Sequence, residues 1–118
     1  VLEPAREIWL NLFHLHGNEV MFEKFVDYPV AAINWHDQDT PPSLAEGKER
    51  FPGVVCGGLQ RWETMVLGTP EQVAAEGQKA IAATGGRRFI LGTGCVTPTV
   101  APRANLMAAR NCVEISFR

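Results

Sequence analysis

The order of short apolar runs and amphipathic stretches is the feature that most constrains the fold of this chain. Four apolar runs of strand length alternate with stretches whose apolar residues recur at helical spacing; the runs cover residues 8–14, 30–35, 53–58 and 88–92. Short apolar runs bounded by glycine or proline are typical of buried strands. Strands that alternate with helices indicate a parallel sheet with right-handed crossovers. The sequence therefore predicts an α/β protein built from four βα units.

Capping signals indicate where the helices begin. The clearest is Thr69, a good N-cap that is followed by Pro70 at the first helical position and by Gln72, which completes a capping box. This helix is expected to run to Thr84 and to end at a pair of glycines. Further helical segments are expected over residues 1–7, 19–27 and 43–50 and after Pro102.

Four βα units can form an open doubly wound sheet or one half of a closed (βα)₈ barrel. No G-x-G-x-x-G turn follows any of the four runs, so the strongest signal for a dinucleotide-binding sheet is missing. A complete barrel typically needs about 250 residues, whereas this chain has 118. We therefore predict a partial (βα)₈ barrel that forms a single domain over residues 1–118.

Composition limits the class of protein. Hydrophobic residues make up 46% of the chain and charged residues 20%, which is typical of a globular domain with a packed core. The net charge of -2 argues against nucleic-acid binding, and no apolar run approaches the roughly 20 residues that a membrane span needs. The N-terminal residues lack the pattern of a signal peptide, and the three cysteines show no pairing motif. We expect a cytoplasmic protein with reduced thiols that binds neither nucleic acid nor membrane.

Residues suited to chemistry gather where the predicted strands end. In parallel βα architectures the ligand site lies at the carboxyl ends of the strands. All three histidines and two of the three cysteines fall there, so a small-molecule substrate is expected at this edge. The four segments are His14-Leu15-His16-Gly17, Asn34-Trp35-His36-Asp37, Cys56-Gly57-Gly58-Leu59 and Gly92-Thr93-Gly94-Cys95.

Two of these segments predict a metal site. His14 and His16 are one residue apart, so in an extended chain their side chains project to the same face and can bind one ion. Cys95 offers a thiolate as the third ligand, which leaves the fourth position of a zinc ion open, as in catalytic zinc sites. Two plainer interpretations stay open. The histidines can hydrogen-bond loop backbone or a substrate carboxylate, and Cys95 can be a small residue in a tight loop.

The other two segments supply candidate catalytic and substrate-binding residues. His36 and Asp37 place an imidazole beside a carboxylate, which suits proton transfer near neutral pH. Neighbouring residues of a strand point to opposite faces, so a direct His36–Asp37 pair needs a bend, and a polar loop with one aromatic wall explains Trp35-His36-Asp37 equally well. Asn34-Trp35 are candidate substrate contacts. Gly57-Gly58 allow a ligand to approach the backbone closely, and a plain turn would also account for them.

Four segments, taken in order, resemble the C-terminal part of the uroporphyrinogen decarboxylase superfamily. They are Ala32-Ile33-Asn34-Trp35, Gly57-Gly58-Leu59, Gly68-Thr69-Pro70-Glu71-Gln72-Val73 and Gly92-Thr93-Gly94-Cys95-Val96. The similarity spans nearly the whole chain. It implies a (βα)₈ barrel of which this chain supplies only the later strands. Half a barrel leaves two unpaired strand edges, so the missing N-terminal half or a second copy of the chain is an expected partner.

The resemblance implies one of two chemistries. True uroporphyrinogen decarboxylases are metal-free lyases that remove acetate carboxyls from a tetrapyrrole. Their last strand typically ends in Gly-His-Gly, and this chain has Thr93 at the position of that histidine. The other branch comprises zinc-dependent methyltransferases, which move methyl groups between corrinoid proteins and thiols and hold zinc by a His-x-Cys pair and a later cysteine. His14 and Cys95 match those positions, and His16 replaces the cysteine of the pair while remaining a competent zinc ligand.

Three hypotheses follow. The first is metal-dependent methyl transfer to or from a thiol or a corrinoid, with zinc bound by His14, His16 and Cys95 and with a corrinoid protein as partner. Because the imidazole of His16 replaces a cysteine sulfur, a substrate thiolate bound to zinc would be less nucleophilic here than in a site with two sulfur ligands. A different metal or a different substrate therefore stays an open alternative. The second is a metal-free decarboxylase in which His36 or Asp37 handles protons. The third is an inactive fragment that assembles with another chain.

Overall fold

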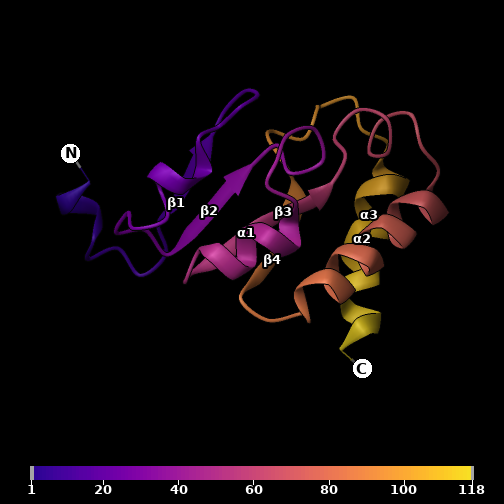
Figure 1. The fold of residues 1–118 in the computed structure, drawn as a ribbon. Helices are drawn as coiled ribbons and strands as arrows, with labels where there is room; N and C mark the ends of the chain where they lie inside the picture. Colours follow the sequence, from indigo (N-terminus) through magenta and orange to yellow (C-terminus); the bar gives the residue numbers. More distant parts are fainter. Residues whose placement is uncertain (1, 118) are drawn as a thin grey trace.

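Four parallel strands form one sheet, in the same order in space as in the chain, in the computed structural model (Figure 1), which describes residues 2–117. The strands are β1 (Leu12–Leu15), β2 (Ala32–Trp35), β3 (Val54–Leu59) and β4 (Phe89–Thr93). The register pairs β1 with β2, β2 with β3 and β3 with β4, all parallel. This arrangement confirms the predicted α/β architecture with a parallel sheet.

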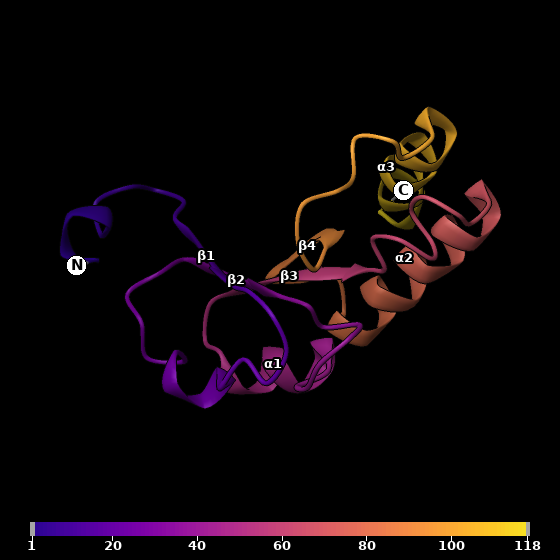
Figure 2. The same ribbon diagram turned by 90° about the horizontal axis from the view of Figure 1, so that it is seen from above.

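Helices precede, connect and follow the strands, and they cover one side of the sheet. Within residues 2–117 they are η1 (Glu3–Ala5) and η2 (Phe22–Lys24), which are short 3₁₀ helices, and α1 (Leu44–Arg50), α2 (Pro70–Thr84) and α3 (Arg103–Ser116). Figure 2 shows α1 against the sheet, with α2 and α3 side by side near β3 and β4. None of these helices is long and apolar enough to cross a membrane.

Capping boxes begin two of the helices, and the one at Thr69 was predicted from the sequence. The Thr69 side chain accepts a hydrogen bond from the Gln72 backbone, and the Gln72 side chain accepts one from the Thr69 backbone, so the predicted capping box begins α2. Gly85 ends this helix in a left-handed conformation with φ 65°. Ser43 and Glu46 form a second capping box that begins α1. These local bonds satisfy backbone donors that a helix start otherwise leaves free.

The predicted N-terminal elements differ from the structure. The helix expected over residues 19–27 is only the 3₁₀ turn η2, because Glu19 and Met21 have φ values of 52° and 48°, which a right-handed helix cannot contain. Of the helix expected over residues 1–7, Val1 lies outside the described residues, and the rest forms only the short η1. The strand expected from residue 8 begins only at Leu12, and the preceding Trp9 is 89% exposed.

The sheet presents two different faces. Side chains such as Ile33, Trp35 and Val55 are fully buried beneath the helices, where they form the main apolar core. Side chains at the intervening positions project to the opposite face, because successive residues of a strand alternate. On this second face one row crosses the whole sheet, and its members in register are His14, Asn34, Cys56 and Ile90.

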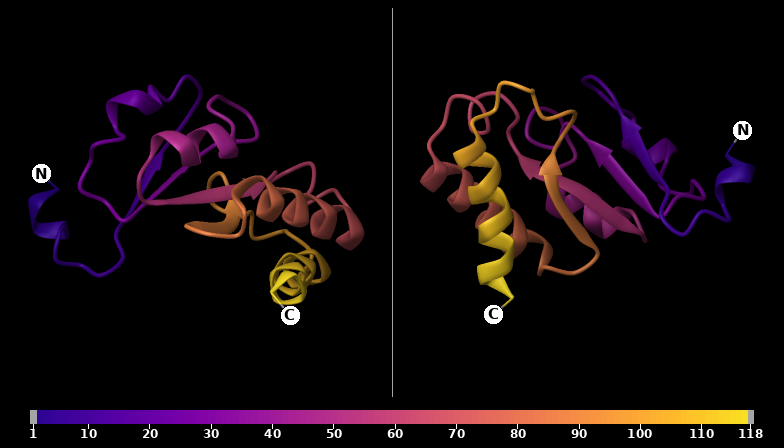
Figure 3. Two further views of the ribbon diagram at one scale, coloured as in Figure 1. Left: turned by 60° about the horizontal axis from the view of Figure 1, so that its bottom comes forward. Right: turned by 180° about the vertical axis from the view of Figure 1, so that it is seen from behind.

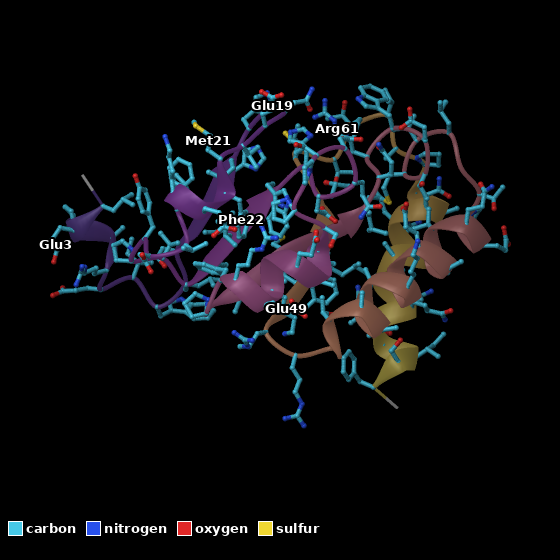
Figure 4. All side chains as sticks on the ribbon, in the orientation of Figure 1. Glu3, Glu19, Met21, Phe22, Glu49 and Arg61 are labelled. Carbon is cyan, nitrogen blue, oxygen red and sulfur yellow. The ribbon has the colours of Figure 1, made fainter. Side chains whose placement is uncertain are left out.

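The loops that follow the strands gather at one end of the sheet (Figure 1). Glu19 and Arg61, from the loops after β1 and β3, both lie at this end, whereas Glu49 of α1 lies away from it (Figure 4). The N-terminal helix η1 and the C-terminal helix α3 lie at opposite sides of the sheet (Figure 3). Residues at the carboxyl ends of all four strands are thus brought close to one another.

Candidate metal centre

Four side chains with metal-binding atoms converge at the carboxyl ends of the strands. His14, His16, His36 and Cys95 each offer one nitrogen or sulfur atom, and these atoms all lie within 4.8 Å of one another. We call these four residues the His/Cys cluster. Ligand atoms of a tetrahedral zinc ion lie roughly 3.5 Å apart, so modest side-chain rotations would bring this set to bonding distance.

The histidines reach the cluster through the parallel register. His14 lies in β1, and His16 is the first residue after it on the same face, as predicted. His36 directly follows β2, and since His14 pairs with Asn34, His16 stands level with His36. The ring centroids of His16 and His36 are 5.2 Å apart.

Cys95 reaches the cluster from the loop after β4. A Cβ on Gly94 would lie 2.7 Å from both the Trp35 carbonyl oxygen and the His36 Cα, so only glycine lets this loop pack so closely on the end of β2. The Thr93 hydroxyl donates a hydrogen bond to the Cys95 carbonyl, which holds the turn. The Cys95 Sγ lies 3.9 Å from the His16 Nδ1. The structure therefore brings the three predicted ligands together and places His36 among them.

Two ring nitrogens of the cluster are buried without a hydrogen-bond partner. They are the Nε2 atoms of His14 and His36. In both rings the other nitrogen has a neighbour: the His14 Nδ1 lies 2.6 Å from the Asn34 Oδ1, and the His36 Nδ1 lies 3.5 Å from the Asp39 Oδ2. A buried polar atom without a partner is costly, and a metal ion would give both nitrogens one. The donor set and its orientation therefore fit a zinc ion.

Asp37 lies outside the cluster. Its two carboxylate oxygens accept hydrogen bonds of 3.2 and 3.1 Å from the Gly58 N–H, and the Gln38 side chain donates to it as well. The carboxyl is buried, and burial raises its pKa above the ordinary value. The carboxylate nearest the His36 ring is therefore Asp39, three residues further along the chain, and not Asp37.

The candidate substrate-binding residues are largely buried. The Trp35 side chain is 0% exposed and packs edge-on against Phe22, on the face away from His14. Gly57 leaves the space that the Asp37 carboxyl fills, and Gly58 has a φ of 101°. Packing and backbone conformation therefore account for the two glycines. Substrate binding by Asn34, Trp35, Gly57 or Gly58 remains a prediction.

The three thiols have different surroundings. Cys56 is buried in the row beside Asn34, and burial, followed by the charge of Asp37, raises its pKa to about 11. This thiol therefore stays protonated at physiological pH. Cys112 is buried in α3, whereas Cys95 is half-buried. Among the cysteines, Cys95 is the one that a metal ion or a solute can reach.

The fold and the cluster define a partial (βα)₈ barrel that carries a His/Cys site at the carboxyl ends of its strands. The family model described as uroporphyrinogen decarboxylase (URO-D) matches residues 6–115. The chain therefore belongs to the uroporphyrinogen decarboxylase family, as its sequence motifs predicted.

One similar solved structure is a methyltransferase from Methanosarcina mazei, with a TM-score of 0.77 and 19% sequence identity. The match covers 92% of this chain and 32% of that chain, so the present chain corresponds to about a third of it. At this identity the likeness shows the fold, which is that of part of a barrel. No curated protein shows significant sequence similarity to this chain.

Proposed function

We propose that this chain is the metal-binding part of a zinc-dependent methyltransferase of the uroporphyrinogen decarboxylase family. The observation that carries the proposal is the convergence of three imidazoles and one thiol at the strand ends, with two buried ring nitrogens that lack partners. The proposal agrees with the similar solved structure, which is a methyltransferase. Its substrates would be a thiol and a corrinoid, carried by a partner protein.

The four donors differ in their access to solvent, and this difference suggests how a substrate enters. His14 and His36 have their Nε2 atoms buried, whereas His16 is exposed. We propose that His14, His36 and Cys95 would hold the ion, and that the exposed His16 marks the side from which a thiol could approach it. A bound zinc ion supplies a Lewis acid that lowers the pKa of such a thiol. The protein supplies one thiolate and otherwise neutral ligands.

The alternative of a metal-free decarboxylase has less support from the geometry. It requires a proton-handling group next to the substrate, and His36 and Asp37 were its candidates. Asp37 is engaged by the Gly58 N–H, and His36 directs its Nδ1 to Asp39. The two residues therefore form no acid–base pair, so we place metal-dependent transfer first.

Cobalt binding tests the proposed function. The full chain with one equivalent of Co²⁺ in place of zinc should show a sulfur-to-cobalt charge-transfer band from Cys95. Adding 2-mercaptoethanesulfonate should strengthen this band, because a second thiolate enters the open position. The control is Cys112→Ala, which removes a buried thiol outside the cluster and should leave both spectra unchanged. If the intensity of the charge-transfer band did not change when the thiol was added, the site would be closed and structural, which would contradict the proposal.

We also propose that parallel strands outside this chain complete the barrel around it. β1 and β4 form the edges of the described sheet, and the apolar Leu12 and Ile90 at these edges are 47% and 37% exposed. For the isolated chain, we expect a second copy to cover these edges. Sedimentation velocity should show a concentration-dependent dimer that Leu12→Lys weakens. A monomer at every concentration would contradict the pairing of copies.

A further inference from the structure

We propose that Asn34 is a positioning residue that fixes the proton and the orientation of the His14 ring, so that its Nε2 faces the metal. The inference rests on the proposed function and assigns Asn34 a role in the interior of the protein. Asn34 is 7% exposed and lies at the centre of the row that crosses the sheet. It therefore acts on the ion through His14.

The hydrogen bonds of Asn34 determine which way its amide points. Its Nδ2 donates to the Cys56 carbonyl oxygen at 2.9 Å and to the Thr93 carbonyl oxygen at 3.1 Å. Carbonyl oxygens only accept, so the amide nitrogen has to face them and both of its hydrogens are used. The Oδ1 is consequently the atom that lies 2.6 Å from the His14 Nδ1. Rotating the amide by 180° would set oxygen against oxygen twice.

This orientation determines the tautomer of His14. Since the Asn34 Oδ1 can only accept a hydrogen bond, the His14 Nδ1 has to carry the proton. A neutral imidazole then keeps its lone pair on Nε2, and that atom is buried without a partner. A ring whose far nitrogen donates to a fixed acceptor is how proteins usually orient a histidine ligand. Asn34 thus holds His14 ready to bind a metal ion before the ion arrives.

Asn34 differs from Asp39, the residue that lies beside the other buried histidine of the cluster, His36. The Asp39 carboxylate lies 3.5 Å from the His36 Nδ1, and its side chain is 41% exposed on a turn. Asn34 is buried, and its three bonds run from β2 to β1, β3 and β4. Its position is therefore set by the whole sheet, and a change there should reach the ion through ring orientation.

The test uses the full chain and three variants. Asn34→Leu removes the acceptor for His14, and Asn34→Asp keeps an acceptor but loses the two donated bonds. The matched control is Asn105→Leu, because Asn105 is 1% exposed and its Nδ2 also donates to two backbone carbonyls, those of Met65 and Gly68, which do not belong to the cluster. Two quantities are measured: the ¹⁵N shifts of the His14 ring in the metal-free chain, and the zinc affinity by competition with a chelating dye.

We expect His14 in the parent chain to be the tautomer with its proton on Nδ1. Asn34→Leu should abolish this preference and weaken zinc binding roughly 10- to 100-fold, the range for loss of an outer partner. Asn34→Asp should keep the tautomer and lose less affinity, and Asn105→Leu should leave both quantities unchanged. A parent His14 protonated on Nε2, or an unchanged tautomer in Asn34→Leu, would overturn the proposal.

The two measurements separate this inference from the proposed function. If the parent chain bound no zinc, the proposed function would fail, while the ring shifts would still decide the role of Asn34. If zinc bound tightly and Asn34→Leu lost no more affinity than Asn105→Leu, the role of Asn34 would fail while the metal site remained. Each result therefore shows which of the two proposals is wrong, the metal-dependent function or the role of Asn34.

Discussion

Replacing Cys95 with alanine should lower the zinc affinity of the full chain by at least about a hundredfold, beyond the range for loss of an outer partner. Cys95 supplies the only half-buried thiol among the cysteines and the only sulfur of the His/Cys cluster. His14→Ala should have an effect of similar size, because it removes the buried Nε2 that lacks a partner. The measurement is competition with a chelating dye, together with zinc content after dialysis.

The control for this pair is Cys112→Ala. It also removes a cysteine sulfur, but a buried one from α3, and should leave the zinc affinity as it is in the parent chain. Zinc content that stays the same in both Cys95→Ala and His14→Ala would remove the metal site from this chain. The proposed function would then have no support beyond family membership.

Trp35→Ala should lower the free energy of unfolding by about 3–5 kcal/mol, the usual cost of emptying a buried aromatic site. The Trp35 side chain is 0% exposed, its ring centroid lies 4.8 Å from that of Phe22, and its Nε1 donates to the Pro42 carbonyl. Trp35→Phe should cost less, because it keeps most of the apolar contact and loses the hydrogen bond. Urea unfolding of the metal-free chain measures both changes.

Trp62→Ala is the matched control for this prediction. Trp62 is 45% exposed, and its removal should change the free energy of unfolding by no more than about 0.5 kcal/mol. A Trp35→Ala variant as stable as the parent would show that the ring is not in the core.

The fold was predictable wherever the sequence carries local signals. Thr69 and Gln72 specify their helix through bonds within a single turn, and β3 is a continuous apolar run, so both elements lie where the pattern placed them. The segment around Met21 has apolar residues at helical spacing, but its backbone follows tertiary contacts. Glu19, for example, bonds through its N–H to the Thr40 hydroxyl. The residue pattern within a segment cannot predict a hydrogen bond to a residue 21 positions away.

The candidate site was predictable in position and partly in membership. Strand ends could be located from the apolar runs, and alternation placed His14 and His16 on one face. That His36 joins them depends on the register between β1 and β2, which the sequence leaves undetermined. The role of Asn34 was hidden for the same reason, because its partners lie on three other strands. The available signal was that His16 and His36 each fall within two residues after the end of an adjacent predicted strand.

The His/Cys cluster takes His14 from β1 itself and its other donors from the segments after β1, β2 and β4, so it joins the two outer strands of the described sheet. An ion held there would be bound by residues from both edges of the sheet and would link them. Part of its binding energy would oppose the separation of those strands, because the unfolded chain offers no preformed site. Loss of the metal would then weaken the attachment of β1 and β4 to the sheet and, at the same time, remove the catalytic activity.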